Sequence, residues 1–268
     1  MNNSRAKTIL IVFFLLTNII LLSMLISSYM EYIQIPDKTL DTTVQLLSEK
    51  GITIDKSLIP DSIGNDKLIT VNNVIDTYEN FARNVLSENH TIEDGVFKNE
   101  KATINYYGDR FRITFNEGLD TSEKDRSPAD KASSYLKSIG IDTGSAKISS
   151  SNNSEGLFTV QFSKAFYNKP FFDSIVTVEI MGTKIISVHG SWFEKEDAVQ
   201  AVNLSSAPSL LVSFFSKNPS ISDTTITNIQ NGYAICENGI FHKQVTLIPV
   251  YEVTTDHFGK FYIDARGN

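Results

Sequence analysis

An unbroken apolar run near the N-terminus is the strongest hydrophobic signal in the chain. It reads TILIVFFLLTNIILLSMLISSYM, from Thr8 to Met30, and holds no charged residue. A helix of this length covers roughly 33 Å, at about 1.5 Å per residue, which is enough to cross the hydrocarbon core of a bilayer. A cleaved signal peptide is the alternative, but its apolar region is shorter and ends in a small-x-small site that this run lacks. The pattern therefore favours a transmembrane helix over residues 8–30.

Charged residues beside this run predict its orientation. Arg5 and Lys7 precede it, whereas Glu31 and Asp37 follow it. Positive charge close to a span stays on the cytoplasmic side. We therefore expect a cytoplasmic N-terminus at residues 1–7 and a single-pass protein of the cell membrane whose body is extracellular.

Beyond the run, helical periodicity alternates with strand periodicity. Apolar residues that recur every three or four positions predict helices over residues 40–50, 74–86, 128–139 and 207–218. Two-residue alternation predicts strands near 52–54, 104–106, 111–115, 158–162, 176–180, 186–192, 224–236, 243–254 and 258–265. Residues 55–70 and 149–155 are predicted to be loops because Pro, Gly, Asn, Asp and Ser interrupt the pattern there.

The order of these segments predicts the fold class. A helix followed by an antiparallel meander occurs three times, which indicates an α+β fold of helix-covered antiparallel sheets rather than a doubly wound parallel sheet. We therefore expect a first extracellular α+β lobe over residues 31–122. A second lobe over residues 123–268 would hold two helix-plus-strands units.

Composition and charge restrict the partners of this body. The 268 residues carry 24 Lys and Arg against 31 Asp and Glu, a formal charge of -7. Because Arg5 and Lys7 are the only charges in the first 30 residues, residues 31–268 carry a charge of -9. Binding to nucleic acid or to an anionic lipid surface depends on cations close to phosphates. We therefore expect neither as a partner.

Sequence motifs for catalysis or cofactor binding are absent. The sequence has neither of the glycine-rich phosphate loops G-x-G-x-x-G and G-x-x-x-x-G-K-[ST], and it has no G-x-S-x-G elbow. Its histidines show no H-x-x-x-H spacing, and Cys236 is the single cysteine. We expect no catalytic residue, no cofactor and no metal.

Three polar residues in the apolar run are candidates for contact with a partner helix. Asn18 lies at mid-depth, where its amide needs a hydrogen-bond partner. Ser23 and Ser27 form a small-xxx-small pair that allows close approach of another helix. The alternative is that these side chains merely bond their own backbone, and the sequence alone does not separate the two.

An aromatic hairpin is the second candidate contact surface. The segment FYNKPFF, residues 166–172, gathers four aromatic residues around a turn at Asn168-Lys169-Pro170, and strand alternation can bury only some of them. Tyr167, Phe171 and Phe172 are the candidate contact residues, because an exposed remainder would form a binding patch. The alternative, which the pattern favours, is that the aromatics close the end of the core.

Three segments together resemble the YycI/YycH family. They are RAKTILIVFFLLTNIILL at the N-terminus, FSKAFYNKPFFDSIVTVEI with GTKIISVHGSW in the middle, and IPVYEVTTDHFGKFYIDA near the C-terminus. Members of this family are single-pass accessory regulators of the WalK (YycG) sensor histidine kinase of low-GC Gram-positive bacteria. In length the chain is nearer YycI than YycH. It departs from the family in lacking a Trp in its first few residues, since Trp192 is its only one.

The resemblance implies a function through contacts rather than catalysis. It implies an ectodomain of PepSY-like lobes, no enzymatic activity, and Asn18 in a helix that contacts the partner. The implied partners are the sensor kinase and a YycH-like paralogue, with a homodimer and a heterodimer both open. The expected function is regulation of an essential two-component kinase of the cell envelope. The alternative is an exported PepSY-type module that binds peptides or modulates a protease.

Overall fold

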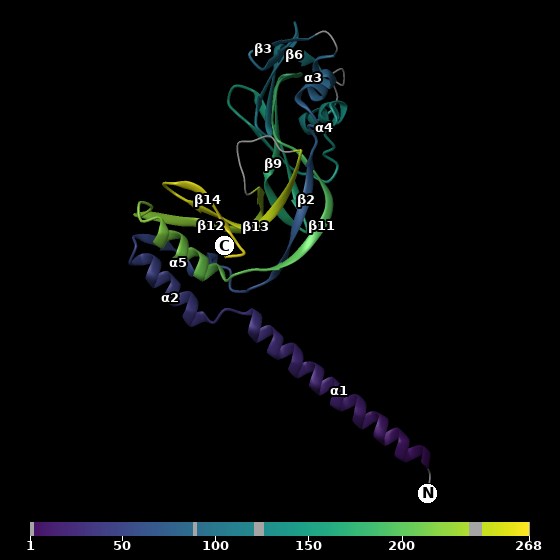
Figure 1. Ribbon diagram of the computed structural model, residues 1–268, viewed down its shortest axis with the longest axis vertical. Helices are drawn as coiled ribbons and strands as arrows, with labels where there is room; N and C mark the ends of the chain where they lie inside the picture. Colours follow the sequence, from purple (N-terminus) through teal and green to yellow (C-terminus); the bar gives the residue numbers. More distant parts are fainter. Residues whose placement is uncertain (1–2, 88–89, 121–125, 236–242, 268) are drawn as a thin grey trace. The chain divides into compact units, whose positions relative to one another are not determined.

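The computed structural model describes residues 3–87, 90–120, 126–235 and 243–267. Within these residues the fold is mixed α+β and mostly sheet, with five α-helices (Figure 1). The helices are α1 (Asn3–Ile33), α2 (Asp37–Ser48), α3 (Tyr78–Leu86), α4 (Pro128–Ser138) and α5 (Ala207–Lys217). The strands are β1 (Ile52–Ile54), β2 (Asn65–Asn73), β3 (Thr91–Glu93), β4 (Val96–Lys98), β5 (Ala102–Tyr107), β6 (Arg110–Asp120), β7 (Lys147–Asn152), β8 (Leu157–Phe166), β9 (Lys169–Met181), β10 (Lys184–Gly190), β11 (Phe193–Asn203), β12 (Thr224–Ile235), β13 (Gln244–Thr255) and β14 (Gly259–Asp264).

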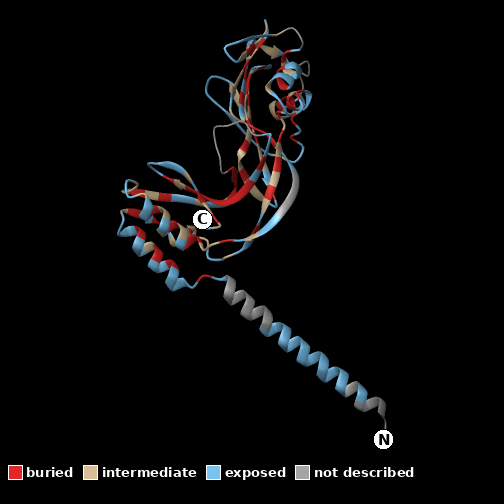
Figure 2. Cartoon of the chain, in the orientation of Figure 1, coloured by how far each residue is buried: buried red, intermediate tan, exposed pale blue. Residues whose placement is uncertain are grey.

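Helix α1 carries the apolar run. Its large apolar side chains from Leu10 to Met24 are 50% to 69% exposed, and Figure 2 shows this stretch in pale blue. Within the part of the chain that the structure describes, no helix combines the length and the hydropathy that a membrane span needs. The span over residues 8–30 stays a prediction.

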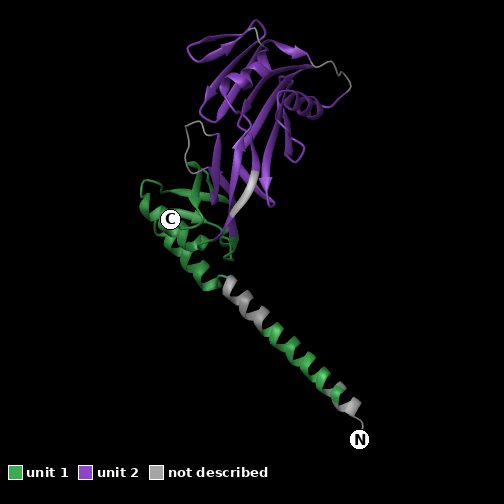
Figure 3. Cartoon of the chain, turned by 45° about the vertical axis from the view of Figure 1, so that its right-hand side comes forward, with its two compact units in different colours: residues 1–65, 203–229, 253–268 green, residues 66–202, 230–252 purple. Residues whose placement is uncertain are grey.

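The chain forms two compact units (Figure 3). Unit 1 comprises residues 1–65, 203–229 and 253–268, and unit 2 comprises residues 66–202 and 230–252. The lobe boundary predicted between residues 122 and 123 lies outside the described residues. Both units draw on segments that are far apart in the sequence.

Unit 1 has its own apolar core between helices and strands. Leu40 and Leu47 lie on the buried side of α2, and Leu211 and Phe215 lie on the buried side of α5. They join one cluster with strand residues such as Ile52, at 0% exposure. Strand β1 pairs in parallel with β12, through residues 52–54 and 224–226.

Unit 2 holds most of a long sheet that is mainly antiparallel, with β12 and β9 paired in parallel, and α3 and α4 cover one face of its β5–β10 part. Its strands are hydrogen-bonded in the order β11-β2-β13-β12-β9-β10-β6-β5-β4-β3, and β8 with β7 extends from β9. The inward residues of one cross-strand row are Ile104, Ile113, Val188, Val178 and Val160. These residues form one buried cluster with residues of both helices, among them Phe81 and Leu136.

The opposite face of this sheet is polar. One row runs across five strands through Asn105, Arg112, His189, Thr177 and Gln161. Successive side chains of a strand point to opposite faces, so this polar row is the counterpart of the apolar row one residue away. The candidate site described below lies on this polar face.

The predicted mixed α+β class is confirmed, whereas several element bounds are wrong. Helix α3 begins at Tyr78 and not at residue 74, because the Thr77 hydroxyl accepts a hydrogen bond from the Asn80 N–H (3.2 Å) and caps the helix there. Strand β2 starts inside the loop predicted over residues 55–70. Strand β7 lies in the predicted loop 149–155 and was hidden because all its residues are exposed, which leaves no apolar alternation.

Candidate functional site

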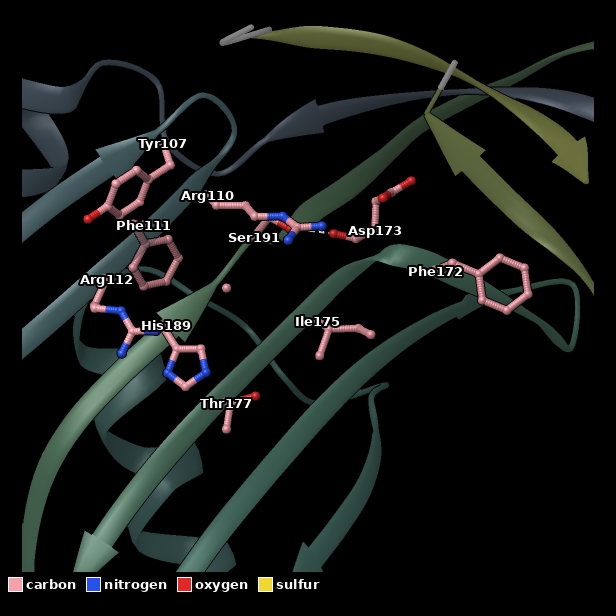
Figure 4. Close-up of a pocket in the computed structure, with 11 residues that line it drawn as sticks. Tyr107, Arg110, Phe111, Arg112, Phe172, Asp173, Ile175, Thr177, His189 and Ser191 are labelled. Carbon is pink, nitrogen blue, oxygen red and sulfur yellow. Dashed lines mark hydrogen bonds between the residues drawn. The ribbon is translucent and has the colours of Figure 1, made fainter. Parts of the chain in front are cut away.

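The candidate site is a cavity of about 450 Å³ on the polar face of unit 2 (Figure 4). Its walls come from the β5–β6 hairpin, from the first half of β9 and from the end of β10. Its arginine, aspartate and histidine side chains are Arg110, Arg112, Asp173 and His189. A small-molecule site of this size is common in proteins.

Local packing explains why the two arginines face the cavity. Phe111 and Ile113 of β6 are 1% and 0% exposed, in the core on the helix-covered side. Alternation along the strand therefore directs Arg110 and Arg112 to the other face, about 7 Å apart. The turn before them is held by the Tyr78 hydroxyl, which donates to the Gly108 carbonyl (2.9 Å).

The two guanidinium groups differ in their partners. Arg110 lies near the Asp173 carboxylate and acts on it electrostatically. Arg112 pairs across the strands with His189, and its guanidinium has no hydrogen-bond or ion-pair partner among the described residues. An unpaired planar guanidinium offers several N–H donors in one plane, which suits a carboxylate or a phosphate. The cavity therefore contains one cation that is free to bind an anion.

The surroundings of His189 favour its neutral form. Burial lowers the pKa of His189 below its ordinary value of 6.5, and the charge of Arg112 lowers it further, whereas Glu179 acts in the opposite direction. The Nδ1 atom of His189 is buried and has no hydrogen-bond partner among the described residues. A buried polar atom without a partner is costly, so the ring of His189 carries an unsatisfied nitrogen below the cavity surface.

Asp173 links the cavity to its surroundings. Its Oδ2 atom accepts a hydrogen bond from the Ile235 N–H (2.8 Å), and its carbonyl accepts one from the Ser191 hydroxyl. Burial raises the pKa of Asp173, although the Ile235 N–H and the Arg110 guanidinium act in the opposite direction. A neighbouring hollow of about 330 Å³ shares Arg110, Asp173 and Ser191 with the cavity.

The aromatic hairpin predicted as a contact surface is divided between core and surface. Phe166 and Phe171 are 7% and 1% exposed and belong to a buried cluster. Phe172 is half-buried and lines the cavity. Tyr167 is 48% exposed, and Lys67 and Lys195 each place Nζ 4.9 Å from the centre of its ring. Two of the aromatics thus close the core, and Tyr167 is the exposed one.

The turn of this hairpin also differs from the predicted one. Tyr167 and Asn168 both have positive φ, of 51° and 62°, and form the turn, whereas Lys169 and Pro170 already belong to β9. The Lys195 ammonium donates to the Tyr167 hydroxyl (3.0 Å) and thereby lowers the pKa of Tyr167.

Helix α1 carries the three candidate contact residues Asn18, Ser23 and Ser27. Asn18 is exposed, and its Nδ2 donates to the Phe14 carbonyl (2.8 Å), which is the backbone bond that the sequence left as an alternative. Ser23 is exposed. Ser27 lies in a stretch whose side chains are outside the described residues.

Side chains of the types that bind metal ions do not form a cluster within the described residues. No group of three or more His, Cys, Asp or Glu residues with the geometry to hold a metal ion occurs among the described residues. Cys236 and His242 lie outside them.

The cavity was not predicted from the sequence. Alternation along β6 and β10 indicates which residues share a face of their own strand, and this signal was available for Arg110 and Arg112. The pairing of Arg112 with His189 depends on the register between strands that are far apart in the sequence, and periodicity does not give that register.

No family model matches the sequence, and no curated protein matches it. Among solved structures, an uncharacterized protein from Eubacterium rectale ATCC 33656 is similar, with 11% identity and a TM-score of 0.47 over 84% of this chain and 96% of that one. YycH from Bacillus subtilis has 13% identity and a TM-score of 0.42, over 71% of this chain and 51% of that one. The Bacillus megaterium YpeB C-terminal domain has 13% identity and a TM-score of 0.30, over 70% of this chain and 90% of that one.

These likenesses do not establish a family, because all three TM-scores lie below 0.5 and the identities are 11% to 13%. One of the three similar structures is a YycH protein. The closer resemblance to YycI stays a prediction.

Proposed function

We propose that this chain is a membrane-anchored accessory regulator, whose exported body and anchor helix bind a sensor histidine kinase of the cell envelope. The observation that carries the proposal is the character of α1. Its large side chains from Leu10 to Met24 are 50% to 69% exposed, and they are apolar on every side of the helix. A helix that is apolar all round belongs in a membrane or in a large core.

The charges around α1 support the proposed topology. Arg5 and Lys7 precede the apolar stretch, and the rest of the chain carries the acidic excess. Because positive charge is retained on the cytoplasmic side, units 1 and 2 would lie outside the cell.

The anchor helix can also take part in recognition. Asn18 uses its Nδ2 on the Phe14 carbonyl, and its Oδ1 remains able to accept a hydrogen bond from a second helix. Ser23 and Ser27, if they face that helix, would allow close approach. The resemblance to the YycI/YycH family supports a kinase and a YycH-like paralogue as the partners.

A second candidate function is an exported PepSY-type module that binds peptides or modulates a protease. The cavity of unit 2 favours it, since a free guanidinium beside an apolar wall suits a small ligand or a chain end. The two functions are compatible in one molecule, because the anchor and the cavity use different residues.

The test combines topology with replacement of the anchor. Protease added to intact protoplasts should digest residues 31–268 and spare the N-terminus. Replacing residues 8–30 by an unrelated apolar helix should abolish co-purification with the kinase and its regulation, while export continues. Protection of residues 31–268 would contradict the topology, and normal regulation by the replaced chain would reduce the helix to a tether.

A further inference from the structure

We propose that the cavity of unit 2 binds a carboxylate that is attached to an apolar group. The proposal does not depend on the function of α1. It rests on two features of the cavity, which are a free guanidinium and an apolar stretch of wall on β9.

The charge of the cavity selects an anion with a single charge. Within the cavity, Arg110 lies near the Asp173 carboxylate, which leaves Arg112 as the cavity cation without an acidic partner among the described residues that line it. The whole chain carries -7, so the positive charge is local to this cavity. A monoanion matches one free guanidinium, whereas a phosphate dianion would leave one charge uncompensated.

The hydrogen-bonding groups around Arg112 suit a planar acceptor. The guanidinium can donate two parallel N–H bonds to the two oxygens of one carboxylate. His189 and Thr177 lie in the same cross-strand row, so their side chains flank the position of such a carboxylate.

One stretch of the cavity wall is apolar. Figure 4 shows Ile175 and Phe172 along β9, on the side away from Arg112. The volume of about 450 Å³ accommodates a carboxylate with an aromatic or branched aliphatic body. Such a group occurs both in free hydrophobic acids and at the carboxyl terminus of a peptide.

The binding experiment uses the full chain in neutral detergent micelles and isothermal titration calorimetry. The probes are N-acetylphenylalanine, its amide, inorganic phosphate, and a pentapeptide that ends in Phe with a free carboxylate. We expect saturable binding of the free acid and of the peptide, and none of the amide. Equal binding of acid and amide, tighter binding of phosphate, or no saturable binding of acid or peptide would overturn the proposal.

A pair of matched variants localises the binding. Arg112→Gln removes the free guanidinium and should weaken binding of the acid by about tenfold to a hundredfold. Arg83→Gln makes the same change at an exposed position on α3, outside the cavity, and should leave binding unchanged. An equal loss in both variants would overturn the proposal. Arg112→Lys, which keeps the charge and loses the planar fork, provides a second variant if Arg112→Gln does not fold.

The same titrations distinguish a free hydrophobic acid from the carboxyl terminus of a peptide as the source of the carboxylate. A peptide that binds at least about tenfold more tightly than N-acetylphenylalanine indicates a peptide terminus, because residues beyond the last one then add contacts. Equal affinities indicate a free hydrophobic acid. Both results support the carboxylate site.

Discussion

Gly190 lets two backbones meet beside the cavity. Its φ of 145° lies in a region that residues with a side chain rarely adopt. A Cβ atom at this position would collide with the Ile175 carbonyl oxygen and would lie 2.8 Å from the Cα of Val176. The residue pairs with Phe111 on one side and with Val176 on the other. Glycine is thus required where β10 ends at the cavity.

We expect Gly190→Ala to lower the free energy of unfolding of unit 2 by about 2–4 kcal/mol, because backbone strain and a backbone clash add together. Gly156→Ala is the control. Gly156 also has positive φ, of 78°, but an added Cβ there meets nothing within 4 Å, so only about 1 kcal/mol should be lost. Urea unfolding followed by the fluorescence of Trp192, the single tryptophan and fully buried in unit 2, measures both. Equal losses would contradict the steric argument.

The pairing of Arg112 with His189 shows what a sequence can and cannot predict about a site. The apolar neighbours of Arg112 predict that it faces outward from the β5–β6 hairpin, and the structure agrees. The same reasoning applies to His189 in β10. Arg112 and His189 lie side by side only because β10 is placed between β6 and β9 in the sheet. The alternation of apolar and polar residues along each strand would fit other strand orders equally well. The site therefore depends on topology and not on local pattern.

The start of α4 could be predicted from the sequence, whereas the start of α3 at its Thr77 cap could not. The helix predicted over residues 128–139 begins at Pro128, as α4 does, and the Ser127 hydroxyl before it accepts from the Asp130 N–H (3.2 Å). The reason is that a cap is a local interaction within four residues. Strands without an apolar face, such as β7, leave no comparable local signal. The sequence therefore predicted the helices but did not predict β7, the polar strand at the edge of the sheet.

We expect Ser127→Ala to destabilise unit 2 by about 1 kcal/mol, because the Asp130 N–H loses its acceptor. Ser206→Ala is the matched control at the start of α5, since Ser206 makes no side-chain hydrogen bond to a backbone N–H of that helix. It should change stability by a few tenths of a kcal/mol. Thermal unfolding followed by circular dichroism compares the two variants. A larger loss for Ser206→Ala would show that the cap bond is not the source of the effect.

The distribution of charge along the chain implies that the cavity and the N-terminal helix would recognise their partners by different interactions. The first 30 residues carry only the cations Arg5 and Lys7, and the remainder carries -9. An acidic body does not steer an anionic ligand from a distance, so the cavity must recognise its carboxylate by short-range contacts of Arg112. Recognition within the bilayer, in contrast, depends on packing and on polar groups that lipid cannot satisfy. If α1 is the proposed anchor, Asn18 is therefore the residue at which partner recognition is best tested.

Replacing Asn18 by Leu should weaken association with the partner while leaving membrane insertion intact. An interhelical hydrogen bond is worth about 0.6–2 kcal/mol, so the expected loss of affinity is about threefold to thirtyfold. Thr17→Val is the matched control, because Thr17 is adjacent, faces another side of α1 and bonds only the Phe13 carbonyl (2.9 Å). Energy transfer between labelled chain and kinase in liposomes measures the affinity, and carbonate extraction measures insertion. If Asn18→Leu binds as tightly as the unmodified chain, the amide serves only its bond to Phe14, and recognition belongs to units 1 and 2.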